Sequence, residues 1–540
     1  MKKFIIGLTI FGALAVSSCN SLEVAPPNSI SDVQIRKLLA SGDAQKVNDI
    51  LTAIAVTPSY FNVYGTYTGY SSYPLNYQVD QEFIFNMLGN DAVLGTQEAA
   101  LKGGHMTYYD MTSSVWRMKD QSGPFWDMPV DFYIAANKSL NFITPAVVTE
   151  NPSLGKGRAD GLVVRSWGYL NLVERFCPAY AQDNNAFGLP IYTEYRINPV
   201  AKISPAKDVY ANIISWLKEA IELYKSDGVK VGYTADVEDI DRGVAQFLLM
   251  KAATEYCDWA TVISVGEELT SAYPNLIPVA NYGAKNAYLD AYVNKTKDFN
   301  AKDNAFLCAA ANPETILAAK YGGLYNKALT WSLCNTLAGG EAGEGKSAPR
   351  IDDRLLAKIA ANDVRKDIFT DHDVVYPYIT DSEGTINNVK LPKQATLKWG
   401  ATQALTETAR SEKSYADNIL MRSSEAYLML AEAYANSGQD SKAIAILDKI
   451  LAARATSGTL TCANSMSGMS ALDMVKLQWR IEMWMEKGLE FFNNRRWGVE
   501  VDRSSSATHY SGTKKLAVKD MIIEVPKDEQ TANTNWSTVY

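Results

Sequence analysis

The sequence predicts a mainly α-helical protein built from repeated helix pairs, with long irregular loop regions between them. Three observations predict this fold. Helical patterns recur in pairs along the chain, and one pair follows the tetratricopeptide template. Two long regions rich in Gly, Asn, Tyr and Asp, residues 57–124 and 280–410, interrupt the helices. The 540 residues are 47% hydrophobic and 21% charged, which is a globular composition.

The clearest helix pair is predicted at residues 418–454, where two short helical patterns flank a polar turn. The first pattern places Tyr427, Leu430, Ala431 and Tyr434 on one face, and the second places Ala443, Leu447 and Ile450 on one face. This spacing follows the tetratricopeptide template of roughly 34 residues, with Ala431 where that template has glycine. We therefore expect a tetratricopeptide-like unit here.

Weaker copies of the same arrangement are predicted earlier in the chain. Because a single helix pair cannot bury its own apolar face, such pairs are expected to stack on one another. We expect the pairs at residues 159–224 and 243–272, a further helix at 126–142 and one long final helix at 469–492.

The N-terminus predicts an exported lipoprotein. Residues 1–18 have the charged start, short apolar core and small-residue end of a secretory signal. Cys19 directly follows Val-Ser-Ser, as in a bacterial lipobox, so we expect a lipid on Cys19 that attaches the chain to a membrane. Residues 19–32 contain two prolines and no helical period, which indicates a flexible tether before one helical domain at 33–540.

Composition and motifs exclude several function classes. A net charge of -8 argues against nucleic acid as a partner. The cysteines are far apart and the histidines number only 3, so we expect no metal site, no cofactor and no histidine-based triad. Neither a G-x-S-x-G elbow nor a phosphate-binding G-x-x-x-x-G-K-[ST] loop occurs, and we predict that the protein is not an enzyme. A carboxylate pair from Asp80, Glu82 and Asp91 keeps a glycoside hydrolase open as an alternative.

Aromatic and amide side chains gather in the two loop regions. Ring faces supply apolar area for sugars, and neighbouring amides and carboxylates orient the hydroxyl groups. Many of these tyrosines are expected to pack against the scaffold, whereas Trp116 lies between polar residues in a non-helical stretch and is the stronger candidate. The predicted ligand-binding residues are Tyr73, Asn90, Asp91, Tyr109 and Trp116 in the first region and Tyr282 and Trp331 in the second.

Several segments together resemble the SusD/RagB family, lipoproteins of the outer surface of Bacteroidetes cells. They occur in the family's order at residues 126–137 (WDMPVDFYIAAN), 159–174, 203–224, 424–438 (SEAYLMLAEAYANSG) and 480–498 (RIEMWMEKGLEFFNNRRWG). Two positions depart from the family pattern: Glu490 stands where the family has arginine, and Asn494 where it has aspartate. This departure predicts altered packing near the last helix.

The resemblance implies a scaffold of tetratricopeptide-like units with long loops that form a ligand face. It implies a cell-surface protein of the outer membrane that captures oligosaccharide or polysaccharide and delivers it to a SusC-like TonB-dependent barrel transporter. A peptide ligand in the same role, a surface-anchored glycoside hydrolase and an adaptor that binds only proteins stay open as alternatives.

Overall fold

The chain divides into two compact units, residues 1–55 and 56–540. A computed structural model describes residues 32–39, 45, 85–93, 122–195, 200–226, 237–283, 303–319, 349–379, 386–399, 417–510 and 515–540. In the first unit this includes helix α2 (Asp32–Leu39). The predicted signal peptide and Cys19 lie outside the described residues, and the predicted boundaries at residues 18 and 32 stay predictions.

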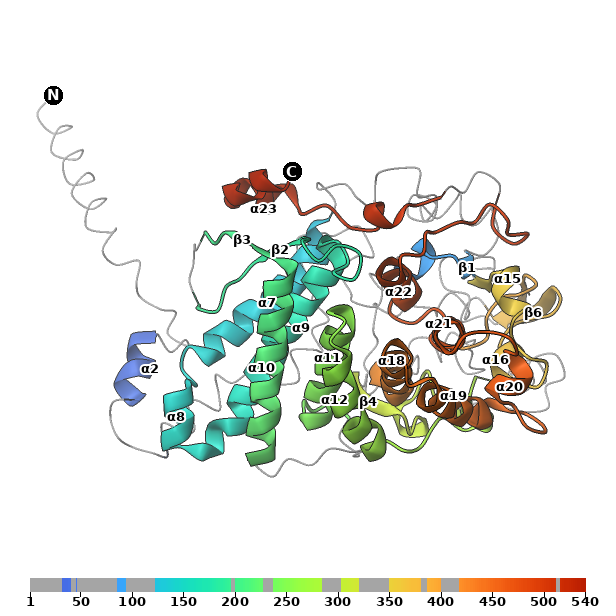
Figure 1. The fold of residues 1–540 in the computed structure, drawn as a ribbon, viewed down its shortest axis with the longest axis horizontal. Helices are drawn as coiled ribbons and strands as arrows, with labels where there is room; N and C mark the ends of the chain where they lie inside the picture. The colour runs from blue at the N-terminus through green and yellow to red at the C-terminus, as the bar shows by residue number, and fades with distance from the viewer. Residues whose placement is uncertain are drawn as a thin grey trace, which may run out of the picture. The chain divides into compact units, whose positions relative to one another are not determined.

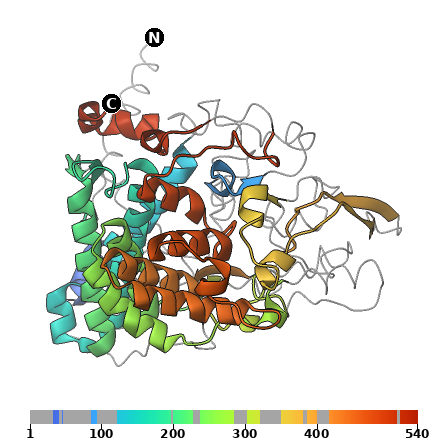
Figure 2. The ribbon, with the colours of Figure 1, turned by 45° about the vertical axis from the view of Figure 1, so that its right-hand side comes forward.

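The second unit is a scaffold of packed helices, which confirms the predicted mainly helical fold. Helices α7, α9, α10, α11 and α12 each pack against the next helix in this order. Helix α12 then packs against α18, and α18 packs against α19 and α21 (Figures 1 and 2). The scaffold helices are α7 (Gly123–Leu140), α9 (Gly155–Phe176), α10 (Ala206–Ser226), α11 (Arg242–Glu255), α12 (Trp259–Ala272), α18 (Ser423–Asn436), α19 (Asp440–Arg454), α21 (Ala471–Glu482) and α22 (Leu489–Trp497).

Apolar periodicity and caps explain why these segments are helical. In α10 the buried positions Val209, Ile213, Leu217 and Tyr224 recur at four- and seven-residue steps. Helix α11 begins at the side chain of Asp241, which accepts from Val244 N at 2.9 Å. Asp258 caps α12 in the same way, and such a cap contributes about 1 kcal/mol.

The tetratricopeptide-like residues explain how α12 and α18 fit together. A Cβ on Gly266 of α12 would lie 3.2 Å from Leu430 Cδ1 of α18, so glycine allows the close approach. Tyr427 of α18 donates through its hydroxyl to the carbonyls of Thr270 (2.8 Å) and Tyr273 (3.1 Å) at the end of α12. The tyrosine therefore satisfies carbonyls that the helix end leaves unpaired.

Short elements complete the described structure. Four antiparallel strand pairs occur among the described residues. Two join segments distant in sequence: β1 (Ala92–Val93) with β5 (Arg350–Ile351), and β4 (Thr315–Ala319) with β8 (Asn418–Arg422). The other two join neighbouring segments: β2 (Phe187–Pro190) with β3 (Ile203–Pro205), and β6 (Val374–Ile379) with β7 (Ile386–Leu391). The short helices are α8 (Pro145–Glu150), α15 (Asp353–Leu356), α16 (Val364–Asp367), α20 (Cys462–Ser465) and α23 (Lys527–Ala532).

Two sequence predictions of secondary structure are wrong. Residues 418–422 form strand β8 before α18 begins. The single helix predicted at 469–492 is two helices, because the turn between them holds Met485, Lys487 and Gly488 at positive φ. Tertiary hydrogen bonds hold that turn open: Asn86 Nδ2 donates to Met485 O at 2.9 Å, and Gly488 N donates to Asn86 Oδ1 at 2.8 Å.

A buried network of ion pairs lies where the scaffold meets the short strands. Glu482, at the end of α21, accepts from Arg422 Nη1 at 2.9 Å, Arg454 Nη2 at 2.8 Å and Arg365 Nη1 at 3.2 Å. Glu314 accepts from Arg422 and Arg454 at 2.7 Å. We call this set, with its further partners, the Glu482 network; its cations are Arg365, Lys398, Arg422 and Arg454, and its anions are Glu314, Asp363, Glu482 and Glu486.

The Glu482 network is neutral when all its members are ionised. Burial alone would raise the pKa of Glu486, but Arg422 and Lys398 outweigh it and lower the pKa to about 2. In the same way the surrounding guanidinium groups hold the pKa of the fully buried Glu482 well below its usual range. The carboxylates are therefore charged at neutral pH, and each is needed to balance a buried cation.

Replacing Glu482 by Gln is expected to lower the free energy of unfolding by about 3–5 kcal/mol, because it leaves buried arginines without their counter-charge. Chemical denaturation of the whole chain measures this loss. The matched control is Glu222→Gln, which affects an exposed pair with Lys225 and should change stability by less than about 0.5 kcal/mol. Equal stability of the two variants would contradict a structural role for the network.

Candidate functional site

The described ends of the two long loop regions converge on one part of the molecule. Strand β1, at the described end of the first region, pairs with β5 in the second, where Ala92 lies opposite Ile351. Asp352 N also donates to Asp91 O at 3.0 Å. Although the paired residues lie more than two hundred positions apart in sequence, these described parts of the two regions are therefore adjacent.

Other described segments of the second region are also held to one another, by strand pairing and hydrogen bonds. Ala319 of β4 lies opposite Asn418 of β8. Asn304 Nδ2 donates to Lys398 O at 2.9 Å, and a Cβ on Gly283, at φ +61°, would meet that same carbonyl at 2.6 Å. We call this set of fastened segments the loop platform; it consists of residues 85–93, 277–283, 303–319, 349–370, 394–399 and 417–422.

Aromatic rings occupy the middle of the loop platform, next to α21. Tyr282 packs against Phe306 with ring centroids 5.0 Å apart, and Phe306 lies 6.4 Å from Trp399. Trp399 is 6.4 Å from Trp484, and of these four rings only Trp399 is partly exposed. The Lys398 ammonium lies 4.5 Å from the centre of the Phe306 ring, and burial lowers its pKa to about 8 although Glu486 opposes this.

Tyr282, a predicted ligand residue, is buried within this aromatic group. Its side chain is 1% exposed, and the Arg454 guanidinium lies 4.6 Å from its ring centre. Trp399 is a partly exposed aromatic that sequence reasoning missed. Its position between Lys398 and Gly400 in a polar loop region is the same signal that singled out Trp116.

Asn90 and Asp91, also predicted ligand residues, hold the loop platform to the C-terminal segment. Asp91 Oδ2 accepts from Arg480 Nε at 2.7 Å. Asn90 Oδ1 accepts from Asp502 N at 2.7 Å, and its backbone carbonyl lies 2.9 Å from His509 Nε2. Both side chains are buried and bonded within the protein.

The ligand role of Asn90, Asp91 and Tyr282 stays a prediction, and their burial gives each a packing role that requires no ligand. The other predicted ligand residues, Tyr73, Tyr109, Trp116 and Trp331, lie outside the described residues.

Glu490, one of the two departures from the family pattern, is bonded within the protein; the altered packing near the last helix stays a prediction. Its carboxylate accepts from Asn90 N at 2.8 Å and from the side chain of Asn494, so the two residues that depart from the family pattern bond to each other. Burial, together with the Asp91 charge, raises the pKa of Glu490 to about 7. Gly89 leaves room for this carboxylate, because a Cβ there would lie only 1.4 Å from Glu490 Oε2.

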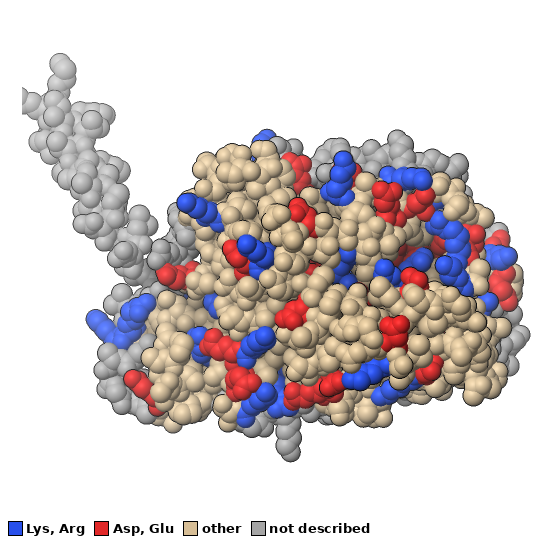
Figure 3. Space-filling view, viewed as in Figure 1, with Lys and Arg blue, Asp and Glu red and all other residues tan. Residues whose placement is uncertain are grey.

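Two acidic residues that the sequence brought into question have structural partners. Asp91 is paired with Arg480, and Asp241 caps α11. No group of His, Cys, Asp and Glu side chains among the described residues is arranged to hold a metal ion. On the face of the described structure in Figure 3, basic and acidic side chains are interspersed.

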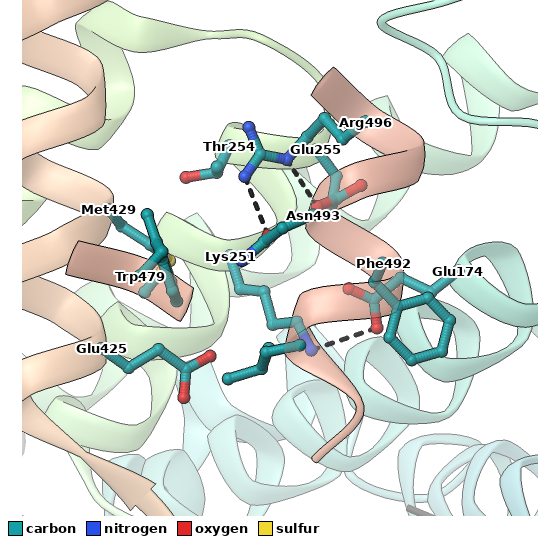
Figure 4. Close-up of a pocket in the computed structure, with 11 residues that line it drawn as sticks. Glu174, Lys251, Thr254, Glu255, Glu425, Met429, Trp479, Phe492, Asn493 and Arg496 are labelled. Atoms are coloured by element: carbon teal, nitrogen blue, oxygen red, sulfur yellow. Dashed lines mark hydrogen bonds and ion pairs between the residues drawn. The ribbon is translucent and has the colours of Figure 1, made fainter. Parts of the chain in front are cut away.

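A small polar cavity lies between α9, α11, α18, α21 and α22 (Figure 4). Its volume is about 10 Å³, measured as the space open to the centre of a water molecule. Ligand pockets span roughly 300–1,000 Å³, so this cavity is far too small for a sugar ring. Two ion pairs, Lys251 with Glu174 at 3.1 Å and Arg496 with Glu255 at 2.9 Å, form part of its wall.

Arg496 belongs to the Arg-Trp-Gly stretch that ends the family-like segment. Its guanidinium binds Glu255 of α11 and both carboxylate oxygens of Glu432 of α18, and Trp497 Nε1 donates to Glu432 at 2.7 Å. Gly498 ends α22 at φ +71°. The stretch therefore fastens the last scaffold helix to two tetratricopeptide-like units.

Solved structures share this arrangement of helical scaffold and loops. A SusD superfamily protein from Bacteroides vulgatus matches with a TM-score of 0.63 and 16% identity over 90% of this chain and 96% of its own. A SusD-like carbohydrate binding protein from the same organism matches with a TM-score of 0.62 and 18% identity over 92% and 97%. A putative sugar binding protein from it matches with a TM-score of 0.58 and 18% identity over 91% and 97%.

The repeat scaffold and the convergent loop platform thus define a protein with the SusD-like fold. Residues 381–540 match the sequence model of the SusD family, and no curated protein matches the chain. This match and the shared fold agree with the sequence resemblance to the SusD/RagB family. None of the described helices is both long and apolar enough to cross a membrane.

His509 is expected to make the protein sensitive to acid. Burial, with Arg503 adding to it, lowers the pKa of His509 to about 3, below the value of about 6.5 in the unfolded chain. The unfolded state therefore binds more protons between these values, so stability is complete above pH 6.5 and falls as the pH drops toward 3. Between pH 6.5 and 4.5 this loss is about 3 kcal/mol.

Unfolding free energies of the wild type and His509→Gln at pH 7.5 and 4.5 measure this contribution. Between pH 7.5 and 4.5, the unfolding free energy of the variant should fall by about 3 kcal/mol less than that of the wild type. His372→Gln, at an exposed histidine, should retain the wild-type pH dependence. A wild-type pH dependence in His509→Gln would contradict the assignment.

Proposed function

We propose that this chain is a cell-surface lipoprotein that captures an oligosaccharide and delivers it to a SusC-like TonB-dependent outer-membrane transporter. The observation that carries the proposal is the convergence of both loop regions on one platform of a SusD-like fold. This arrangement lets aromatic and amide side chains from distant parts of the sequence contribute to one ligand face.

The carbohydrate specificity is supported by two further observations. Two structures with the same fold are described as a carbohydrate binding and a putative sugar binding protein. The loop regions of this chain combine tyrosine and tryptophan with asparagine and aspartate, which suits stacking on sugar rings and hydrogen bonding to their hydroxyls. We propose Tyr73, Tyr109, Trp116 and Trp331 as ligand-binding residues, together with Asn90, Asp91 and Tyr282.

Delivery to a transporter requires that the protein stay beside it. The predicted lipid on Cys19 and the tether at residues 19–32 would keep the body at the outer face of the outer membrane while it moves over the barrel. Binding and handover need no covalent chemistry, which fits the described carboxylate Asp91 being paired with Arg480.

Replacing Trp116 by Ala is expected to weaken binding of the cognate oligosaccharide about tenfold or more, because a stacked tryptophan contributes on the order of 1–2 kcal/mol. Glycan-array screening followed by titration calorimetry measures it. Tyr195→Ala is the matched control, since Tyr195 is 39% exposed and lies outside both loop regions.

Three other outcomes would replace the carbohydrate proposal. Co-purified peptides without enrichment of any glycan would indicate a peptide ligand in the same role. Sustained release of reducing ends from a polysaccharide would indicate a hydrolase. Binding of proteins alone, unchanged by Trp116→Ala, would indicate an adaptor.

Replacing Cys19 by Ala is expected to move the protein from the membrane fraction to the soluble fraction, because the acyl chains provide its attachment. Cell fractionation and labelling with a radioactive fatty acid measure the two consequences. The control is Cys257→Ala, at a free cysteine in the folded body, which should leave both results unchanged. Membrane retention of Cys19→Ala would contradict the lipid anchor.

A further inference from the structure

The small cavity beside α11 contains polar atoms that have no partner in the protein. Four of its lining residues each carry one such atom: Glu174 Oε1, Thr254 Oγ1, Glu255 Oε2 and Trp479 Nε1. Each of these residues is at most 4% exposed. A buried polar atom without a partner costs about 1–3 kcal/mol, so four around one cavity indicate an occupant that binds them.

The chemistry of these atoms matches a molecule that both donates and accepts hydrogen bonds. The indole N–H of Trp479 can only donate, the free carboxylate oxygens of Glu174 and Glu255 can only accept, and the Thr254 hydroxyl can do either. Thr254 and Trp479 lie on the same side of Lys251 in Figure 4, and Glu174 lies on the other. Water has two donors and two acceptors and meets both requirements.

The charges around the cavity leave no place for a cation. Lys251 pairs with Glu174, Arg496 with Glu255 and Lys487 with Glu425. The wall and its direct partners are balanced, with the anions Glu174, Glu255, Glu425 and Glu432 and the cations Lys251, Lys487, Arg495 and Arg496. An additional cation would be unbalanced, and the N–H of Trp479 would point its positive end toward it.

The size of the cavity and its access to solvent also favour water as the occupant. The volume of about 10 Å³ open to a water centre corresponds to about one water molecule. Lys251 is 21% exposed, so the wall reaches solvent on that side and water can enter.

We propose that this cavity binds one structural water molecule, which pairs with Trp479 Nε1 and Thr254 Oγ1 and donates to a free carboxylate oxygen of Glu174 or Glu255. The water joins α21 and α11, and through Glu174 also α9. It is thus a component of the scaffold that connects the C-terminal helices to the tetratricopeptide-like units, and it is independent of any ligand at the loop platform.

A crystal structure of the whole chain at about 1.8 Å resolution tests the site directly. We expect a density peak within about 3.2 Å of both Trp479 Nε1 and Thr254 Oγ1. An empty cavity would overturn the proposal. A peak surrounded by five or six oxygen atoms at about 2.4 Å would also overturn it, because those distances are typical of a bound cation.

Thr254→Val provides a second test, because the sign of its effect depends on the water. If the hydroxyl binds water, the equilibrium constant for folding should fall about fivefold, equivalent to about 1 kcal/mol. If the cavity is dry, removing an unpaired hydroxyl should leave this constant unchanged or raise it.

The matched control for this test is Thr315→Val. Thr315 Oγ1 is also buried and without a partner, but the residue lies in β4 and does not line the cavity. We expect this variant to keep or increase the stability of the wild type. A Thr254→Val variant that behaves like Thr315→Val would contradict the bound water.

Discussion

The Glu482 network is the constraint on which the rest of the structure depends. Its charges come from β8, α16 and its cap, α19 and α21, from the residue before β4, from the turn after α21 and from the segment before Trp399. All are buried except Glu486, whose side chain is 10% exposed. Ionised groups in such a place are tolerated only when each has its counter-charge in good geometry. The network therefore requires segments separated by more than a hundred residues to meet in one arrangement, which gives the loop platform a fixed base.

A second group of buried charges holds helices of the scaffold together in the same way. Arg496 binds Glu255 and Glu432, and so connects the final helix to two tetratricopeptide-like units. Together the two groups explain why the family-like segment at 480–498 is rich in charge although most of it is buried. Its charged residues fasten the scaffold together.

The sequence predicted much of the scaffold and little of the site. Helix positions followed from apolar periodicity, and Tyr427 and Ala431, predicted to share one apolar face, are both buried. The long helix expected at 469–492 was wrong because Asn86, distant in sequence, holds the intervening turn open. A signal for the buried network was present: Arg454 follows Leu447 and Ile450 on the apolar face of α19, where a charge requires a partner.

By itself, the sequence determined that this protein is helical and that its helices pair and stack, because these properties depend on local periodicity. Only the tertiary structure decided that Asn90, Asp91 and Tyr282 are buried and that the two loop regions share one platform. Those outcomes depend on contacts between residues hundreds of positions apart, and such contacts leave no periodic signal in one sequence.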